Sequence, residues 1–294
     1  MRIDGREIAK EILQDLQRRV DILRTKNIVP NLAIILVGED PASLSYVKQK
    51  VLKASEIGAV ADVINLPVTI SEKKLLEKIK KLNDDKNVHG IIVQQPLPKQ
   101  INLQTLYAAI NPQKDVDGFC ANSPFTMPLA VAVIKILEKI YSEIERATGL
   151  PAKALATAGP RAFKTWLQNK NIVVIGKGET GGGPVISLLK KMNCKVDVID
   201  SKTHNPDELL QNADIVITAV GKAGIVRSEM IKHEAVLINV GMHKEADGKL
   251  HGDYEEEDIK DIASFYTPTP GGVGPVNVAM LLANVIQSAE SIAA

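Results

Sequence analysis

The chain has 294 residues, of which 45% are hydrophobic and 24% are charged, and its formal net charge is +1. This composition is typical of a globular protein with room for two domains, while the near-neutral charge and only 3% aromatic residues argue against nucleic acid or a membrane surface as partner. Two cysteines exclude a disulfide framework, the N-terminal residues are unlike a signal peptide, and no apolar run is long enough to span a membrane. We therefore expect a cytoplasmic protein. Because the five histidines lack metal-ligand spacing, we expect no metal site.

The first half of the chain alternates predicted helices and strands. Recurring apolar residues predict helices at 8–20, 46–57, 72–82 and 103–110. Apolar runs predict strands at 32–37, 63–68 and 90–94. Ser43 is expected to cap the second of these helices. The alternation predicts an α/β domain.

The second half begins with a less regular stretch. We expect a helix at 129–145, a break at 148–151, and two helical pieces within 152–168 separated by Gly159 and Pro160. Apolar strands are expected at 172–175, 194–199, 215–220 and 236–240. A stiff loop without regular structure is expected at 267–275, followed by a last helix at 278–292.

A glycine turn follows the strand at 172–175. Gly176, Gly178 and Gly181 have the G-x-G-x-x-G spacing, and a helical pattern begins near Pro184. In this context the spacing predicts a Rossmann-type dinucleotide site, because the helix N-terminus offers free N–H groups to a pyrophosphate. Asp200 ends the next strand, 24 residues after Gly176, where an acid can hold an adenosine ribose. The alternative is a glycine-rich connection that binds nothing.

Two later strands add candidates to the same site. The strands at 215–220 and 236–240 are each followed by a glycine. Ligands of open α/β sheets bind beyond such carboxyl ends. We therefore expect cofactor contacts from Val220, Gly221 and Met242.

Polar residues of the first half could carry chemistry. Tyr46 and Lys50 share one face of a helix, although a solvated rim would look the same. Gln94 ends a buried strand and needs a hydrogen-bond partner, which could be structural or a ligand. Asp117 precedes a glycine in a turn that could be ordinary. The glycines of the 267–275 loop could admit a ligand or merely form a turn.

Five strings occur in one order along the chain. They are Asp40-Pro-Ala-Ser43 with Tyr46 and Lys50, Gly90-Ile-Ile-Val-Gln-Gln-Pro-Leu-Pro98, Lys114-Asp-Val-Asp-Gly-Phe119, Asp247-Gly-Lys-Leu-His-Gly-Asp253 and Pro270-Gly-Gly-Val-Gly-Pro275. With them the chain resembles the bifunctional methylenetetrahydrofolate dehydrogenase/methenyltetrahydrofolate cyclohydrolase family over nearly its whole length, except about 120–170.

The resemblance implies a two-domain α/β fold and a homodimer. Residues 1–122 and 270–294 would form a folate-binding catalytic domain, and residues 123–269 a Rossmann-type NAD(P)-binding domain, with the last helix returning to the first domain. Folate would lie in a cleft beside the nicotinamide ring. The enzyme would oxidise 5,10-methylenetetrahydrofolate and hydrolyse the product to 10-formyltetrahydrofolate, in one-carbon metabolism and purine biosynthesis.

The resemblance also implies roles for individual residues. Lys50 resembles the catalytic lysine, Tyr46 would stack on or orient the folate, and Gln94 would hydrogen-bond the lysine and tune its protonation. Asp117 resembles the pterin anchor. The folate would be lined by Pro270, Gly271 and Gly272.

The cofactor edge departs from the family pattern. Lys177 and Gly178 replace an Arg-Ser pair, and the second strand ends in Asp200, Ser201 and Lys202 where the family has His-Ser-Arg. Asp200 would favour the ribose hydroxyl of NAD, whereas the two lysines would attract the extra phosphate of NADP. The family habit favours NADP, which we take as the expected cofactor, with NAD as the alternative.

Other functions stay open at this point. Because the 120–170 segment also differs, one alternative is a cyclohydrolase with weak or lost dehydrogenase activity, and a re-routed linker is the simpler explanation of the segment. A dinucleotide-sensing protein without chemistry, or an unrelated small-substrate dehydrogenase, would leave the strings of the first half unexplained.

Overall fold

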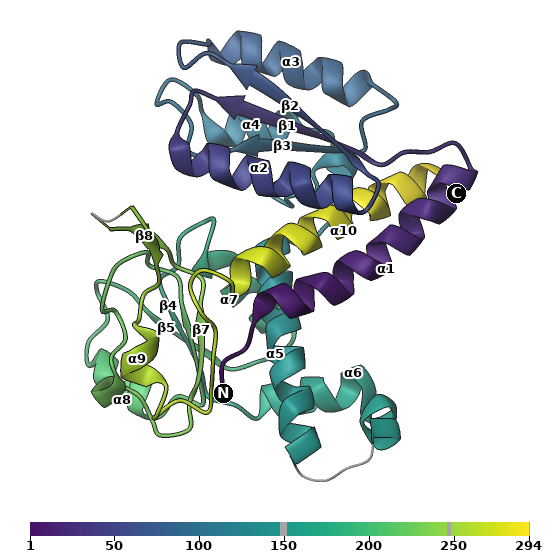
Figure 1. Ribbon diagram of the computed structural model, residues 1–294. Coiled ribbons are helices and arrows are strands. Elements are labelled where there is room, and N and C mark those ends of the chain that lie inside the picture. Colours follow the sequence, from purple (N-terminus) through teal and green to yellow (C-terminus); the bar gives the residue numbers. More distant parts are fainter. Residues whose placement is uncertain (148–151, 246–247, 294) are drawn as a thin grey trace. The chain divides into compact units, whose positions relative to one another are not determined.

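The structure is a computed structural model that describes residues 1–147, 152–245 and 248–293. The predicted break at 148–151 and Asp247 lie outside the described residues. The chain forms two compact units (Figure 1). The three-stranded unit comprises Ala9–Pro128 and Val278–Ala294, and the five-stranded unit comprises Met1–Ile8 and Leu129–Asn277.

The three-stranded unit is built on a parallel sheet. Its central strand β1 (Asn31–Val37) lies between β2 (Val60–Leu66) and β3 (Gly90–Gln94). Alternate residues of β1 enter two apolar cores, with Ile34 in one and Ile35 in the other. The predicted buried strands at 32–37 and 90–94 are confirmed, because successive side chains of β1 and β3 point to opposite, covered faces. The strand predicted at 63–68 is instead Val60–Leu66, an edge strand that is largely exposed.

Helices supply the other side of each core. On one core pack α3 (Glu72–Asp84) and α4 (Leu103–Ala109), and on the other α1 (Gly5–Thr25), α2 (Pro41–Glu56) and α10 (Val273–Ala293). A short 3-10 helix, η1 (Pro112–Lys114), follows α4. The yellow α10 lies beside the purple α1 in Figure 1, and Arg19 of α1 donates two hydrogen bonds to Glu290 of α10 at 2.8 and 2.7 Å. The predicted return of the last helix to the first domain is therefore confirmed.

Two local predictions in this part of the fold are wrong. Ser43 does not cap α2, because the Asp40 carboxylate accepts the Ser43 N–H at 2.8 Å and Pro41 begins the helix. The loop predicted at 267–275 is shorter, since α10 begins at Val273 rather than at 278. Pro275 is accommodated because the first turn of a helix needs no N–H donor there.

The five-stranded unit has a doubly wound parallel sheet in the order β10-β7-β6-β4-β5. Its strands are β4 (Ile172–Ile175), β5 (Val196–Ile199), β6 (Ile215–Thr218), β7 (Val236–Asn239) and β10 (Phe265–Tyr266). The chain reverses its winding direction between β4 and β6, which is where such sheets bind ligands. The predicted Rossmann-type class and the four predicted strands are confirmed.

Shorter elements surround this sheet. They are α7 (Gly182–Lys191), α8 (Pro206–Gln211), η2 (Ser228–Met230), α9 (Glu256–Ile259) and an antiparallel hairpin of β8 (His243–Lys244) and β9 (Leu250–His251). Two helices precede the sheet, α5 (Pro128–Ala147) and α6 (Ala152–Gln168). Gly159 leaves helical geometry with φ 58°, so α6 is two pieces, as predicted. Among the described residues, no helix is both long and apolar enough to cross a membrane.

Candidate functional site

The candidate chemistry of the three-stranded unit begins at the start of α2. The Ser43 hydroxyl lies 2.9 Å from the Asp40 carboxylate and 3.0 Å from the carbonyl oxygen of Gln95, just beyond β3. This contact fastens the first turn of α2 to the end of β3. Tyr46 and Lys50 follow on one side of the helix, four residues apart, so the anchored turn determines where both side chains point.

Lys50, Gln94 and Asp117 come together as the sequence predicts. Lys50 Nζ donates to Gln94 Oε1 at 3.0 Å, and the Gln94 amide in turn donates to the Gln95 carbonyl at 2.9 Å, which fixes its orientation. Burial lowers the pKa of Lys50, and the charge of Asp117 partly opposes that shift. Burial raises the pKa of Asp117, against the attraction of Lys50 and with a smaller contribution from Asp115. Burial therefore favours the neutral forms of Lys50 and Asp117, and the attraction between the two charges opposes it. Burial also raises the pKa of Tyr46.

The charged turn before Asp117 is mostly structural. Lys114 is buried, and its ammonium donates to the carbonyl oxygens of Leu82, Asn83 and Asp85 at 3.0, 2.8 and 2.6 Å. It thereby gives hydrogen-bond partners to carbonyl groups at the end of α3. The Asp115 carboxylate accepts the Cys120 N–H at 2.7 Å. From α10, the Asn284 amide donates to the carbonyl oxygens of Val116 and Thr126 at 2.8 and 3.1 Å. These contacts hold the turn that carries the half-buried Asp117 side chain.

In the five-stranded unit, the glycine turn lies at the carboxyl end of β4. Gly176 has φ +90°, and a Cβ there would lie 2.7 Å from the Ala219 carbonyl oxygen beyond β6. A Cβ on Gly182 would lie 1.9 Å from the Gly176 carbonyl oxygen. Gly182, rather than the predicted Gly181, lets α7 approach the strand so closely. A Cβ on Gly178 would meet no atom within 4 Å, so its small size is not required by packing.

Asp200 ends β5 in a shallow pocket, and its acid is held ionised. The pocket has a volume of about 430 Å³ and is lined by Lys177, Gly183, Ile186, Lys190, Val198, Asp200 and Thr203. Lys177 Nζ lies 2.7 Å from Asp200 Oδ2, and the Lys202 N–H donates to Oδ1 at 2.9 Å. The Lys177 hydrogen bond is the largest of the contacts that lower the pKa of Asp200 to about 2. Ser201 is exposed in the turn that follows.

A buried carboxylate arranges the loop beyond β6. Asp253 accepts the backbone N–H groups of Val220, Gly221 and Lys222 at 2.9, 2.7 and 2.9 Å. The Asp253 N–H itself donates to Asn239 Oδ1 at 2.8 Å. Three hydrogen bonds to one charged group hold a loop strongly. The predicted cofactor residues Val220 and Gly221 therefore have a fixed backbone.

Met242 lies against the same loop. A Cβ on Gly221 would lie 2.9 Å from the Met242 carbonyl oxygen, so the segments beyond β6 and β7 touch at this point. The Asn239 amide donates to the carbonyl oxygen of Gly241 and to the Thr269 hydroxyl, each at 2.6 Å. One polar network thus joins the loops beyond β6 and β7 to the segment that leads into α10.

The glycines next to Pro270 are explained by packing as well as by the predicted ligand. A Cβ on Gly271, whose φ is +111°, would lie 2.6 Å from the Arg6 guanidinium. A Cβ on Gly272 would lie 2.6 Å from the Pro268 carbonyl oxygen, and Gly5 donates to the Gly271 carbonyl at 2.8 Å. A larger residue at Gly271 would strain the backbone because of its positive φ, and a larger residue at Gly272 would press on the backbone of Pro268.

Sequence reasoning missed three residues that build these sites. Gly182 was hidden because three glycines stand in a row at 181–183. Asp253 was part of a family string but had no assigned role, and Asn284 was one polar residue in a predicted helix. No local pattern identifies the last two, since their partners lie 31–33 and 158–168 residues away in the chain.

The two units together define a class of protein. One has a glycine turn at the switch point of a doubly wound sheet, and the other has a half-buried lysine that donates to an amide and interacts electrostatically with a carboxylate. Such a chain is an α/β enzyme that combines a dinucleotide cofactor with proton chemistry.

Comparison with known proteins identifies the family. Residues 3–117 match the catalytic domain, and residues 161–293 the NAD(P)-binding domain, of tetrahydrofolate dehydrogenase/cyclohydrolase. The bifunctional protein FolD of Lactococcus lactis is 39% identical, with 98% of this chain and 96% of the relative covered. The chain belongs to the tetrahydrofolate dehydrogenase/cyclohydrolase family. The resemblance inferred from the five strings is confirmed, and with it both enzyme activities.

Solved structures agree with this assignment. The FolD enzyme of Campylobacter jejuni is similar with a TM-score of 0.87 and 32% identity, covering 99% of both chains. The Trypanosoma brucei enzyme, solved with NADP and an inhibitor, is similar with a TM-score of 0.84 and 30% identity, covering 100% of this chain and 98% of that one. The predicted two-domain α/β fold class is confirmed.

Proposed function

We propose that Lys50 is the catalytic group of this enzyme, and that it acts with Gln94, Asp117 and Tyr46 on 5,10-methylenetetrahydrofolate and 5,10-methenyltetrahydrofolate. The observation that carries the proposal is the hydrogen bond of 3.0 Å from Lys50 Nζ to Gln94 Oε1, in a setting where burial lowers the pKa of Lys50. A lysine that serves as a base must be neutral, and burial is the usual way to make it so.

The dehydrogenase step needs positioning more than a base. Lone pairs of the two folate nitrogens drive the hydride from the methylene carbon and leave an amidinium-like cation. Bound NADP would supply the hydride acceptor. In this step the chain's own residues orient the folate: the Asp117 carboxylate accepts paired pterin N–H groups, Tyr46 lies against the folate, and Pro270, Gly271 and Gly272 line it.

The hydrolytic step needs a proton acceptor. Water attacks the cationic carbon while neutral Lys50 takes one of its protons, which gives a neutral hydroxyl adduct. The bond from that carbon to N5 then breaks as N5 takes up a proton from the lysine ammonium. The hydroxyl of the adduct loses its own proton to the lysine and then to solvent, which leaves the carbonyl group of 10-formyltetrahydrofolate. Gln94 Oε1 accepts one N–H of the amine and so orients its lone pair. The nearby cation of the substrate lowers the pKa of Lys50 further, which is the direction that the mechanism requires.

The crevice of the five-stranded unit fits a dinucleotide, and we propose NADP. Gly176 and Gly182 let the turn and the start of α7 pack closely against the sheet, while a Cβ on Gly178 would meet no atom within 4 Å, so the turn is open there for a pyrophosphate at the helix N-terminus. Two ammonium groups, from Lys177 and Lys190, line the pocket around Asp200 and suit an additional phosphate. The similar Trypanosoma brucei enzyme was solved with NADP. Asp200 supports NAD as the alternative, because an ionised acid accepts ribose hydroxyls.

The remaining cofactor residues and the domain limits complete the proposal. Gly178, Gly181, Ser201 and Lys202 would contact the adenosine half, and Val220, Gly221 and Met242 the half beyond β6. We propose a folate domain of residues 1–122 with 270–294, and a cofactor domain of residues 123–269. The catalytic-domain match over 3–117 supports the first range, and the hydrogen bonds from Arg19 of α1 to Glu290 of α10 support the return of the last helix.

A homodimer in the cytoplasm, without nucleic-acid or membrane partners, is the assembly that the family suggests. Sedimentation equilibrium tests the dimer, and a monomer at micromolar concentration would contradict it.

A cofactor-linked assay tests the function. Methylenetetrahydrofolate is supplied with NAD or NADP separately, reduced cofactor is followed by absorbance, and methenyltetrahydrofolate hydrolysis is measured in a second cuvette. We expect turnover in both assays, with NADP preferred. Hydrolysis without cofactor reduction would indicate an enzyme with cyclohydrolase activity but no dehydrogenase activity. Dinucleotide binding with neither reaction would indicate a sensing protein and contradict the proposal.

A further inference from the structure

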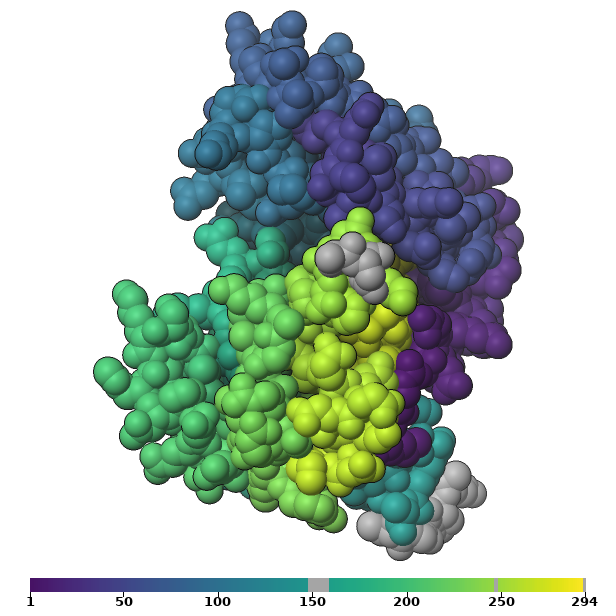
Figure 2. Space-filling model, turned by 60° about the vertical axis from the view of Figure 1, so that its left-hand side comes forward, coloured from purple at the N-terminus to yellow at the C-terminus, as the bar shows by residue number. Residues whose placement is uncertain are grey.

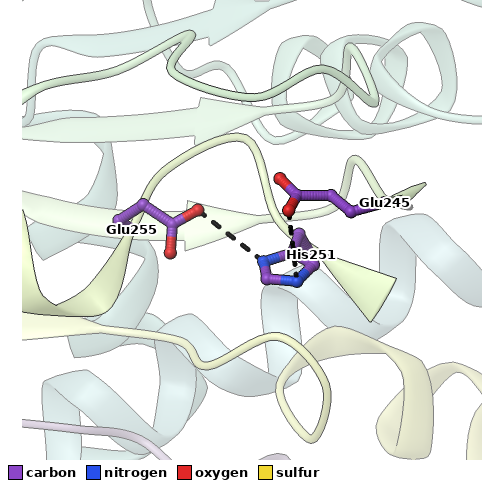
Figure 3. Close-up of side chains that lie close together, drawn as sticks. All are labelled: Glu245, His251 and Glu255. Atoms are coloured by element: carbon purple, nitrogen blue, oxygen red, sulfur yellow. Dashed lines mark ion pairs between the residues drawn. The ribbon is translucent and has the colours of Figure 1, made fainter. Parts of the chain in front are cut away.

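The β8–β9 hairpin brings together two histidines and two glutamates. His243 and His251 are direct partners across the antiparallel ladder, and their ring centroids lie 6.0 Å apart. Glu245 stands two residues after His243, so both side chains leave the same face of the strand. In Figure 3, His251 lies between Glu245 and Glu255, which approach it from opposite sides.

The contacts in this cluster are too long for hydrogen bonds. Glu245 Oε1 lies 3.5 Å from His243 Nε2, Glu245 Oε2 lies 3.8 Å from His251 Nε2, and Glu255 Oε1 lies 3.8 Å from His251 Nδ1. Nitrogen and oxygen atoms that share a tetrahedral zinc ion at about 2.0–2.1 Å are separated from each other by roughly 3.4 Å. Ligand atoms of Glu245, His251 and Glu255 also lie within 4.8 Å of one another. Small movements would place them around one ion.

His243 supplies a second, independent observation. Both of its ring nitrogens are shielded from solvent and have no hydrogen-bond partner in the part of the chain that the structure describes. Buried polar atoms normally have a partner. An ion held by the cluster would satisfy one of these nitrogens and replace the long contact to Glu245 with a shared ligand.

We propose that His243, Glu245, His251 and Glu255 bind one divalent transition-metal ion of the zinc class, with Glu245 and His251 as its central ligands. Two imidazoles with carboxylates suit zinc, cobalt or nickel, whereas magnesium and calcium select oxygen ligands alone. The sequence did not predict this site because His243 and His251 become neighbours only through pairing of the two strands of the hairpin, and not through a helix or a short motif.

The proposed metal site is open to solvent and lies beside the segment that precedes α10. Glu245 and Glu255 are 44% and 60% exposed, and the yellow-green residues around 250 lie at the surface in Figure 2. His251 and Glu255 also line a pocket with Thr269 and Pro270, which precede α10. The ion would fasten the hairpin beside that segment. This role is independent of the proposed folate chemistry.

Calorimetric titration of the chelator-treated, full-length protein with zinc chloride tests the proposal. We expect one ion per chain and no heat from magnesium chloride. His251→Asn and Glu245→Gln should each weaken zinc binding at least about tenfold, since even residues that only support a metal ligand commonly contribute that much. The matched controls are His204→Asn and Glu208→Gln, which change exposed residues elsewhere in the same unit and should bind as the unchanged protein does.

Two further readouts separate metal binding from folding and from other ligands. Without metal, all four variants should melt at the same temperature as the unchanged protein, and zinc should raise that temperature for the unchanged protein and the controls only. Cobalt should give an absorption spectrum without a thiolate band. Equal affinity in His251→Asn and the controls, or a thiolate band that assigns the ion to a cysteine, would overturn the proposal.

Discussion

Each unit pairs a lysine with an aspartate, and the two pairs behave in opposite ways. In the five-stranded unit, Lys177 is 65% exposed and its hydrogen bond lowers the pKa of Asp200 to about 2. In the three-stranded unit, burial outweighs attraction, so that the pKa of Asp117 is raised and that of Lys50 is lowered. The first pair is a charged surface that can recognise a cofactor. The second can exist without charge and so can transfer protons.

The comparison shows that burial, rather than the presence of a partner, decides what a lysine can do. Solvent around Lys177 keeps its ammonium stable, and an exposed ion pair adds little to stability. Lys50 is half-buried, burial lowers its pKa, and its amine donates to one neutral acceptor, the amide oxygen of Gln94. The same two residue types therefore serve recognition in one unit and catalysis in the other.

The largest expected effect comes from removing the buried amine. Lys50→Met should reduce methenyltetrahydrofolate hydrolysis by about 10²- to 10⁴-fold, the usual contribution of a general base, while folate still binds. Lys48→Met, which changes an exposed lysine on the same helix, should hydrolyse normally. Hydrolysis rates and calorimetric folate binding measure both variants. Full activity of Lys50→Met would show that Lys50 is not the general base of hydrolysis.

The pH dependence of hydrolysis tests whether Lys50 acts in its neutral form. Burial disfavours the ammonium form, so the pKa of Lys50 lies below 10.5 and the neutral amine is present at lower pH than for an exposed lysine. The rate at saturating substrate should rise about tenfold for each pH unit below that pKa and level off above it. Asp117 attracts the proton, so Asp117→Asn should shift the rise to lower pH.

Stopped-flow absorbance, corrected for uncatalysed hydrolysis, gives this profile. Glu56→Gln, at an exposed residue of the same helix, should leave the rise where it is. A profile that is flat, or that rises only near the pKa of a lysine in water, would show that the amine does not act in its neutral form.

The fold could be predicted from the sequence wherever one short pattern determines one element. β1, β3, β4, β6 and β7 were predictable because short, unbroken apolar runs rich in β-branched residues are typical of strands in a sheet covered on both faces. The start of α10 was not, because Val273 and Gly274 have no helical pattern and are held by packing around Gly272. The β8–β9 hairpin is only four paired residues, too few for a periodic signal.

The candidate site, too, could be predicted only in part from the sequence. The resemblance identified Lys50, Gln94 and Asp117 as a group, and the structure supplies the contacts among them. It could not separate Lys114, which donates to the carbonyl groups at the end of α3, from Asp117 three positions further along the turn. Burial and long-range hydrogen bonds make that distinction, and neither is a local property of the sequence.

A smaller effect is expected from the glycine turn of the five-stranded unit. In Gly182→Ala the new methyl group would stand 1.9 Å from the Gly176 carbonyl oxygen, so backbone must move. Overpacking of this kind lowers the free energy of unfolding by about 1–3 kcal/mol. Gly178→Ala is the matched control, because its methyl group meets no atom within 4 Å. Urea unfolding compares them, and equal stability of the two variants would contradict the assigned role of Gly182.

The smallest expected effect concerns the choice between NADP and NAD. Because the pKa of Asp200 is about 2, its carboxylate is charged at any pH at which the enzyme is assayed. Asp200→Asn should remove a charge that repels the extra phosphate of NADP, release Lys177 to attract it, and weaken the hold on the NAD ribose. We expect the ratio of kcat/KM for NADP to that for NAD to rise by up to about tenfold. Asp207→Asn changes an exposed acid in α8 and should leave the ratio unchanged. An unchanged ratio in Asp200→Asn would mean that this surface pair does not contact the adenosine ribose, and that another part of the crevice selects the cofactor.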